Sequence, residues 1–378
     1  MTDFSELALQ KHKALKGKIS ISTRDTVDSK DKLSTYYTPG VGAVSSYVAE
    51  HPDEAKDYTW LNNNIAVISD GSAVLGLGNI GPYGALPVME GKSMLFKQFA
   101  GIDAVPIVLD VHTADEIVTA VMAIAPSFGG INLEDIAAPL CFEVEDRLAE
   151  ALPIPVMHDD QHGTAVVALA GIINACKVTK RNLSDTKIVI VGAGAAGVAV
   201  AKLLYKYARP HIVAVDSKGI VSANRSDLND AKQRLLSFTN EDEAEGTLAD
   251  AIKDADIFIG VSRPNLLTTD MVKTMRKDAI IFAMANPVPE IMPDVARAAG
   301  AAVVATGRSD FPNQVNNSLA FPGIFRGALD HRVRQITDEH KIAAAEALAA
   351  LVTNPSPEMI IPGPFDTGTV EAVSRAIR

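Results

Sequence analysis

The stretch that decides the fold is residues 187–197, which read KIVIVGAGAAG. The first five residues are typical of a buried β-strand, and Gly192, Gly194 and Gly197 follow at once in the spacing G-x-G-x-x-G. A strand, a glycine-rich turn and a helix, predicted over residues 199–207, together open a dinucleotide-binding unit. The turn therefore predicts a phosphate loop, whose other members are Ala193, Ala195 and Ala196.

A second predicted strand, residues 211–216, ends in an acid. Asp216 stands 19 residues beyond Gly197, close to the spacing of about 20 expected for a carboxylate that binds the adenosine ribose. A carboxylate there favours NAD, because it repels the extra phosphate of NADP. Lys218 and Arg225 follow closely and are placed to bind that phosphate. NAD is therefore slightly favoured and NADP stays open.

The chain of 378 residues is long enough for two hydrophobic cores. Further strands predicted at 256–261, 279–285 and 301–305 complete a doubly wound parallel sheet of the Rossmann type. Upstream, strands predicted at 65–69 and 105–109 alternate with a helix at 113–125, which indicates a smaller α/β domain. We expect an α/β fold with a substrate and metal domain over 1–160 and a dinucleotide-binding domain over 161–378, joined by an apolar helix at 164–177.

Composition narrows the classes of partner. A net charge of −11 argues against nucleic acid and anionic membranes, which would repel the chain. Two cysteines without CxxC spacing indicate a reduced compartment. The polar N-terminal residues lack a signal-peptide core, and we see no run near the roughly 20 apolar residues of a membrane span. We expect a cytoplasmic protein with a small-molecule substrate.

Two acidic pairs, Glu134-Asp135 and Asp159-Asp160, each follow a short apolar run that resembles a strand end. Solvated acidic turns are the ordinary interpretation of such pairs. Their position at strand ends, just before a nucleotide-binding unit, favours instead an oxygen-rich site for Mg²⁺ or Mn²⁺. His158 and His162 flank the second pair and could in principle bind zinc instead. We interpret both histidines as structural or supporting residues.

One lysine and two tyrosines are candidates for proton transfer. Lys92 follows Gly91 in an apolar, helix-like stretch; most lysines lie on the surface, but a desolvated one loses its proton more easily and can act as a base. Tyr36 and Tyr37 open the turn YYTPGVG, and a phenol beside such a lysine would be a proton donor.

Together these motifs resemble those of malic enzymes, in particular the small bacterial and archaeal type. The resemblance covers nearly the whole chain and rests on motifs in a fixed order. They are Tyr37-Thr38-Pro39, Leu75-Gly76-Leu77-Gly78 with Lys92 downstream, Leu133-Glu134-Asp135, Asp159 to Ala165 (DDQHGTA), the loop 192–197, Asn286-Pro287, Asn316-Asn317 and Phe321-Pro322-Gly323.

The resemblance implies roles for individual residues. Tyr37 would be the general acid and Lys92 the general base, with Asp159 tuning the lysine. Metal ligands would be Glu134, Asp135 and Asp160. Substrate would be bound by Lys92, Asn286 and Asn317, and the cofactor by Thr164, Asn286 and Asp216 together with the phosphate loop. Larger family members carry an arginine before the LGLG segment that clamps a substrate carboxylate, where this chain has Ala73.

The implied reaction is metal-dependent oxidative decarboxylation of L-malate to pyruvate, through oxaloacetate, with NAD or NADP reduced. Lys92, kept neutral by its surroundings, would take the hydroxyl proton, and Tyr37 would protonate the enolate. Two alternatives stay open: a metal-dependent oxaloacetate decarboxylase with little dehydrogenase activity, and a module that senses nucleotide and organic acid without chemistry. We expect a homodimer, in which Tyr37 and Lys92 from different subunits form one site.

Overall fold

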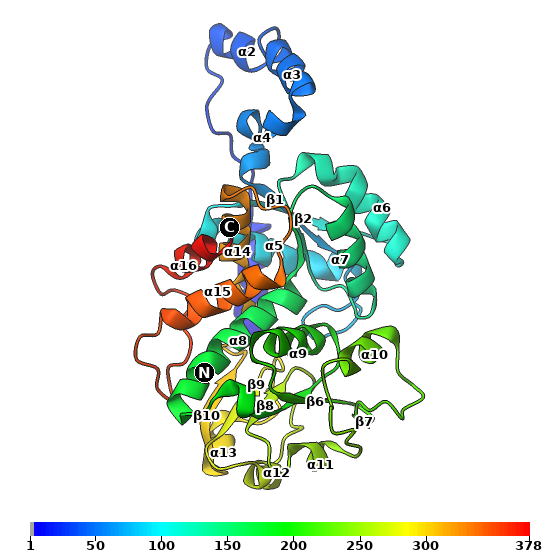
Figure 1. The fold of residues 1–378 in the computed structure, drawn as a ribbon. Helices are drawn as coiled ribbons and strands as arrows, with labels where there is room; N and C mark the ends of the chain where they lie inside the picture. Colours follow the sequence, from blue (N-terminus) through cyan, green and yellow to red (C-terminus); the bar gives the residue numbers. More distant parts are fainter. Residues whose placement is uncertain (1–3) are drawn as a thin grey trace.

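Two parallel sheets, one after the other along the chain, form the body of the protein in a computed structural model that describes residues 4–378 (Figure 1). The first sheet has the strand order β2-β1-β3-β4, and all its pairs are parallel. Its strands are β1 (Asn64–Ser69), β2 (Asp103–Val108), β3 (Ile131–Leu133) and β4 (Val156–His158), and its helices are α5 (Gly81–Ala100), α6 (Ala114–Ile124) and α7 (Leu140–Ala151).

The second sheet confirms the Rossmann-type prediction. Its order is β10-β9-β8-β5-β6-β7, and only the short β7 is antiparallel. Its strands are β5 (Lys187–Val191), β6 (His211–Asp216), β7 (Gly219–Ile220), β8 (Ile257–Gly260), β9 (Ala279–Ala283) and β10 (Ala301–Thr306). Its helices are α9 (Ala195–Ala208), α10 (Asp230–Leu236), α11 (Leu248–Ile252), α12 (Thr269–Thr274) and α13 (Pro293–Ala298). Near-continuous apolar strands are buried here, as expected of a sheet covered on both faces.

Helix α8 (Asp159–Thr179) runs from the first sheet to the second and packs on α9 and α15. It is the one helix in residues 4–378 that is long and apolar enough to cross a membrane, and it extends beyond the apolar helix predicted at 164–177. Two-thirds of its most apolar stretch is buried inside the protein, as in a core helix.

The chain returns to the first sheet after β10. Helices α14 (Phe321–Asp330), α15 (Asp338–Ala350) and α16 (Thr369–Ala376) pack on one another, and α14 also packs on α5. Phe96 of α5 contacts both Phe321 and Phe325 of α14, with ring centroids 4.6 and 5.5 Å away. The two sheets are thus tied together by a shared apolar core.

An N-terminal arm, residues 30–62, projects from the body (Figure 1). It contains α2 (Lys30–Tyr36), α3 (Val41–Glu50) and α4 (Ala55–Tyr58), and follows α1 (Phe4–Leu15). No residue of α2 or α3 is buried, although α3 is largely apolar. The short 3-10 helices of the chain are η1 (Pro52–Glu54), η2 (Trp60–Asn62), η3 (Ala125–Ser127), η4 (Leu183–Asp185) and η5 (Asn317–Leu319).

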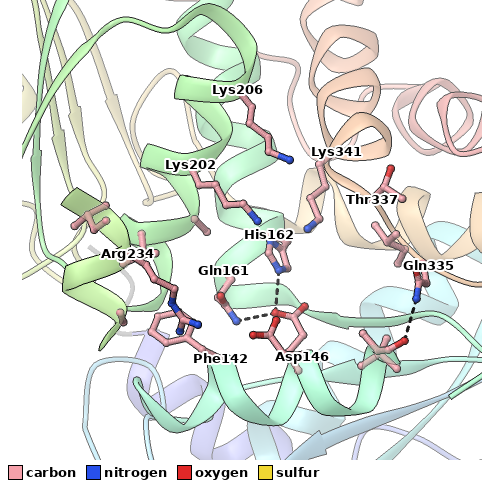
Figure 2. Close-up of a pocket in the computed structure, with 18 of the residues that line it drawn as sticks. Phe142, Asp146, Gln161, His162, Lys202, Lys206, Arg234, Gln335, Thr337 and Lys341 are labelled. Atoms are coloured by element: carbon pink, nitrogen blue, oxygen red, sulfur yellow. Dashed lines mark hydrogen bonds and ion pairs between the residues drawn. The ribbon is translucent and has the colours of Figure 1, made fainter. Parts of the chain in front are cut away.

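A cavity of about 830 Å³ lies where the two sheets' helices meet, and we call it the α7–α9 cavity (Figure 2). It is lined by α7, the first turn of α8, α9, α10 and the segment 334–341.

Candidate active site

Three carboxylates gather at the carboxyl edge of the first sheet. Glu134 and Asp135 follow β3, and Asp160 is the second residue of α8, directly after β4. Because β3 and β4 are parallel neighbours, their ends meet at the same edge. One oxygen from each of the three carboxylates lies within 4.8 Å of the others. The structure therefore brings together the three residues predicted as metal ligands.

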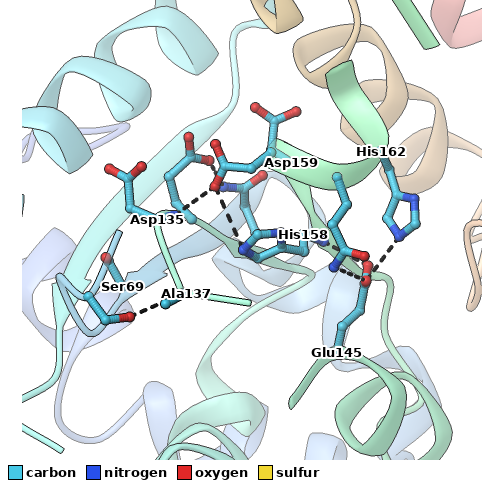
Figure 3. A network of polar contacts seen from close by, with 12 residues as sticks. Ser69, Asp135, Ala137, Glu145, His158, Asp159 and His162 are labelled. Atoms are coloured by element: carbon cyan, nitrogen blue, oxygen red, sulfur yellow. Dashed lines mark hydrogen bonds and ion pairs between the residues drawn. The ribbon is translucent and has the colours of Figure 1, made fainter. Parts of the chain in front are cut away.

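The donor set fits a hard divalent cation. All three groups offer oxygen, which Mg²⁺ and Mn²⁺ prefer. Asp135 lies in the left-handed region with φ 54°, and its Oδ2 is buried without a hydrogen-bond partner in residues 4–378. Its backbone N–H donates to Oδ2 of Asp160 over 2.8 Å, which holds the Asp160 carboxylate against the backbone of Asp135 (Figure 3). A cation would satisfy the orphaned oxygen.

Burial raises the pKa of three acids here, Glu134, Asp135 and Asp159. Desolvation, and then the charge of Asp160, raise the pKa of Asp135 to about 7. Desolvation also raises the pKa of Glu134 and of Asp159, against the opposing effect of Lys92. Packed negative charge of this kind is relieved by protons or by a cation. The site is thus built to attract positive charge.

Lys92 enters the same cluster from α5. Its Nζ lies 2.6 Å from Oδ2 of Asp159 and 2.8 Å from Oε1 of Glu134, and its side chain is 8% exposed. The ammonium also lies 4.2 Å from the ring centroid of Phe321. Helical spacing explains the burial, because Lys92 shares the inward face of α5 with Met89 and Phe96.

The expectation that Lys92 is kept neutral is corrected by these contacts. Burial by itself lowers the pKa of the lysine, but the charges of Asp159 and Glu134 outweigh it and raise the pKa above its ordinary value. The buried pairs hold the proton on Lys92. The lysine becomes a base only where some of that negative charge is taken up elsewhere.

Glu145 is a supporting residue that sequence reasoning missed. This α7 carboxylate accepts hydrogen bonds from the backbone N–H of His158 at 2.8 Å and from Nε2 of Gln161 at 2.9 Å, and it lies 2.9 Å from Nε2 of His162 (Figure 3). Despite desolvation, His162 helps to lower its pKa to about 2. The available signal was an acid on the apolar face of α7, beside Cys141, Val144 and Leu148.

Both histidines support the turn. His158 is fully buried and its Nε2 lies 3.7 Å from Asp160, while His162 lies against Glu145. Neither belongs to the group of possible metal ligands found in residues 4–378. Glu145, through the His158 backbone and the side chains of Gln161 and His162, thus holds the β4–α8 turn that presents Asp159 and Asp160.

Asn317 lies against the first turns of α8. A Cβ on Gly163 would overlap the Asp159 carboxylate and would lie 3.0 Å from Cβ of Asn317. Gly163 therefore leaves the space that the Asp159 carboxylate and η5 occupy beside α8. Thr164 is the next residue of the helix, one turn beyond Asp160.

Asn286 follows β9 at the carboxyl edge of the second sheet. Its backbone oxygen is 3.4 Å from the position that a Cβ on Gly76 would take, and its side chain lies beside Gly307. Gly76 belongs to the predicted 75–78 loop after β1. The second sheet's edge thus faces the loops of the first sheet at this point.

The phosphate loop has the predicted form. Gly192 has φ 115°, and a Cβ there would lie 2.6 Å from the carbonyl oxygen of Val261. A Cβ on Gly197 would overlap the carbonyl of Gly192, whereas the space beside Gly194 is open. Gly194 is the N-cap of α9 and makes no side-chain cap, so the first amides of the helix are free for an anion.

Asp216 lies at the end of β6 among cations. Arg225 donates to both of its oxygens over 2.8 Å, and Lys232 donates to Oδ2 over 2.6 Å. Against the effect of burial, these bonds lower the pKa of Asp216 to about 2. Lys218 instead pairs with Asp227 at 2.8 Å. The carboxylate is thus partly neutralised where a ribose or its phosphate would lie.

Tyr37 is the predicted residue that the structure does not bring to the site within one chain. It caps the C-terminus of α2 in the N-terminal arm and is 67% exposed. Figure 1 shows α2 and α3 projecting beyond the first sheet, while Lys92 lies on α5 in the body. The physical reason is that the main packing partners of α2 and α3 are each other, α4 and η1, all within the arm.

The comparisons with known proteins cover nearly the whole chain. Residues 16–149 match the family described as "Malic enzyme, N-terminal domain", and residues 161–377 match "Malic enzyme, NAD binding domain". A bifunctional malic/malolactic enzyme of Bacillus subtilis (strain 168) is 54% identical over 375 residues, which are 98% of this chain and 92% of that protein.

The names of two further relatives state which cofactor each uses. An NADP-dependent malic enzyme of Halomonas elongata is 45% identical over 399 residues, covering 100% of this chain and 93% of its own. The crystal structure of an NAD-dependent malic enzyme from Thermotoga maritima superposes with a TM-score of 0.95 at 50% identity and 98% coverage of both chains.

Proposed function

This chain belongs to the malic enzyme family, and from that premise we infer that it catalyses the oxidative decarboxylation of L-malate to pyruvate and CO₂ with reduction of NAD or NADP. The reaction passes through enzyme-bound oxaloacetate and depends on a divalent metal. The observation that carries the inference is the convergence of Glu134, Asp135 and Asp160 beside the buried pair of Lys92 and Asp159.

Named residues of this chain account for the proton and binding steps. We assign Glu134, Asp135 and Asp160 to Mg²⁺ or Mn²⁺, which when bound supplies Lewis-acid polarisation of the substrate oxygen. Lys92 accepts the hydroxyl proton at Nζ, and Asp159 positions that atom. Asn286 and Asn317 orient the substrate from the second sheet's side of the site. Cation binding at Glu134 reduces the negative charge that holds the Lys92 proton.

For the cofactor we assign the phosphate loop, Thr164, Asn286 and Asp216. NAD is favoured because Asp216 keeps oxygen lone pairs for the ribose hydroxyls. Arg225 and Lys232 beside it also offer positive charge to the phosphate of NADP. We therefore expect activity with both cofactors.

The test is to follow cofactor reduction by near-ultraviolet absorbance with L-malate, Mn²⁺ or Mg²⁺, and NAD and NADP in separate reactions, and to assay pyruvate at the end. Reduction accompanied by an equal amount of pyruvate is the expected result. Metal-dependent loss of added oxaloacetate without any reduction would replace this function by the decarboxylase alternative. Malate oxidation or oxaloacetate decarboxylation would each contradict the alternative of a sensing module without chemistry.

We further propose that the protein works as a homodimer in which the N-terminal arm delivers Tyr37 to the partner subunit's site as the general acid. The arm supports this proposal, because its exposed apolar residues need a cover that the body of its own chain does not provide. They are Leu33, Tyr36, Tyr37, Val41, Val44, Tyr47, Tyr58 and Trp60.

Mixed dimers test the shared site. Tyr37→Phe and Lys92→Ala proteins are each expected to be inactive, and unfolding and refolding them together should restore part of the activity, because one site of each heterodimer is then intact. A mixture that stays inactive while heterodimers form would contradict the proposal. Light scattering measures the dimer independently.

We propose the division into a metal and substrate part at 1–160 and a dinucleotide part at 161–378, with α14 of the second part supplying Phe321 beside Lys92.

We likewise propose a cytoplasmic location. The free, buried thiols of Cys141 and Cys176 support this proposal, because disulfides are rare in that reducing compartment.

A further inference from the structure

The α7–α9 cavity has no part in the proposed reaction. Its walls include Gln161 and His162 but neither Asp159 nor Asp160, and none of the phosphate-loop residues 192–197. Figure 3 shows His162 and Glu145 on one side of His158, with Asp135 and Asp159 on the other. The cavity is therefore a separate space behind the β4–α8 turn. Its volume of about 830 Å³ suits a small molecule.

Three lysines on one wall of the cavity form ion pairs with the same acid, Asp338. Lys202 and Lys206 of α9 lie 3.3 and 2.5 Å from Oδ2 of Asp338, and Lys341 of α15 lies 3.3 Å from Oδ1. Three ammonium groups face the Asp338 carboxylate, and Glu145 also acts on Lys341, so positive charge stays in excess on this wall. Lys341 is 8% exposed, and its burial lowers its pKa even though Glu145 and Asp338 oppose the shift. A further negative charge would stabilise this wall.

Two arginines add to the excess. Arg234 of α10 and Arg334 line the cavity, and within residues 4–378 their side chains make no hydrogen bond or ion pair. Figure 2 shows Arg234, Lys202 and Lys341 pointing into the same space. Guanidinium groups left without partners at a concave surface are typical of anion-binding sites.

The acids of the lining lie on the opposite wall. Glu145 accepts from the backbone of His158 and from Gln161 and lies against His162, and its charge also acts on Lys341, so it offsets part of the charge of that one lysine. Asp146 and Glu150 lie on α7, across the cavity from α9. Apolar side chains line the space between the walls: Phe142, Val198, Tyr205, Leu235 and Phe238. The cavity thus offers a cationic wall, an apolar middle and a wall of acceptors.

We propose that the α7–α9 cavity is a second binding site, for a small polyanion of the phosphate-ester or polycarboxylate class. Lys202, Lys206 and Lys341 hold the charged groups together with Arg234. The carbon skeleton lies on the apolar middle, and hydroxyl or amino groups donate to Asp146 and Glu150. Both anion classes present several oxygens to clustered cations, which is the chemistry that this wall recognises.

Calorimetric titration with pyrophosphate and with citrate tests the site. The protein is first saturated with NADH, so that the phosphate loop is filled, and divalent metal is left out, so that citrate has none to chelate. We expect one saturable site, with tighter binding of pyrophosphate identifying a phosphate ligand and tighter binding of citrate a polycarboxylate. Arg234→Ala and the double variant Lys202→Ala/Lys206→Ala should each weaken binding at least about tenfold.

Lys273→Ala is the matched control, because Lys273 is a 63% exposed lysine on α12 and does not line the cavity. Its affinity should equal that of the unmodified protein. The proposal is overturned if neither anion binds at millimolar concentration. It is also overturned if binding persists unchanged in both cavity variants while their thermal unfolding matches the control.

Discussion

The Nζ atom of Lys92 lies 2.6 Å from Oδ2 of Asp159, with the lysine 8% exposed and the aspartate fully buried. A buried ammonium keeps its proton only where carboxylates offset its desolvation. Asp159 and Glu134 provide that offset, and Glu134 is also a candidate metal ligand. The proton affinity of the candidate base and the charge of the metal site are therefore physically linked.

Lys92→Ala should abolish malate oxidation, because it removes the amine to which we assign the hydroxyl proton. We expect kcat to fall by a factor of about 100 or more, with NADH binding unchanged. Lys97→Ala is the control: Lys97 is on the same helix but 56% exposed, and it pairs with Asp103. Full activity of the Lys92→Ala variant would show that the lysine is not needed for catalysis.

Asp160→Asn should weaken Mn²⁺ binding by a factor of about ten or more, because the site loses one of its three anionic oxygen donors. Malate oxidation and oxaloacetate decarboxylation should both fall. Titration of Mn²⁺ by electron paramagnetic resonance measures the affinity directly. Asp110→Asn, in the exposed loop after β2, should leave it unchanged. An unaltered Mn²⁺ affinity in the Asp160 variant would show that this carboxylate is not a ligand.

Gly163→Ala should displace Asp159, because the added Cβ overlaps its carboxylate and presses on Asn317. We expect loss of activity and a decrease of about 1–3 kcal/mol in the free energy of unfolding. Gly91→Ala is the control within a helix, where the nearest atom, Nζ of Lys18, is 3.6 Å away. Denaturant unfolding and kcat report both effects. Normal activity in the Gly163 variant would mean that the turn has room to rearrange.

Arg225→Ala should raise KM for NADP more than KM for NAD, because it removes a guanidinium held 2.8 Å from Asp216 and leaves that carboxylate less neutralised. Initial rates with each cofactor measure the ratio. Lys277→Ala, an exposed lysine distant from β6 in sequence, serves as the control. Equal changes for the two cofactors would show that Arg225 acts only on the stability of the loop.

Glu145→Gln should make stability less dependent on acid pH. The pKa of Glu145 is about 2 in the fold against an ordinary 4.5, so the folded state favours the ionised form. The stabilisation is complete above about pH 4.5 and is lost as the pH falls towards 2. The stability difference between wild type and variant should therefore shrink across that range.

Urea unfolding at several acid pH values measures that difference. The exposed Glu150→Gln, on the same helix, should keep the wild-type pH profile. A difference that stays constant from neutral pH to pH 2 would contradict a selective interaction with ionised Glu145.

Local sequence patterns were sufficient to predict the strands and the candidate site residues that follow them. Residues 187–191 and 211–216 are strands as predicted. They could be recognised because buried parallel strands consist of short apolar runs. Glu134, Asp135 and Asp160 could be predicted as one group, because residues that follow neighbouring parallel strands meet at one edge. The helix at 164–177 begins earlier than predicted, at Asp159, since the carboxylates occupy its first turn.

The sequence by itself thus determined the α/β fold, the glycine-rich turn of the predicted phosphate loop and the acids of the candidate metal site, because local patterns specify strands, turns and the residues that follow them. Tertiary structure alone decided that the charges of Asp159 and Glu134 raise the pKa of Lys92, that Glu145 supports the β4–α8 turn, and that Tyr37 lies outside its own chain's site. These properties arise from contacts between segments far apart in sequence. Burial and charge at such contacts are set by which helices pack together, and no local pattern encodes that choice.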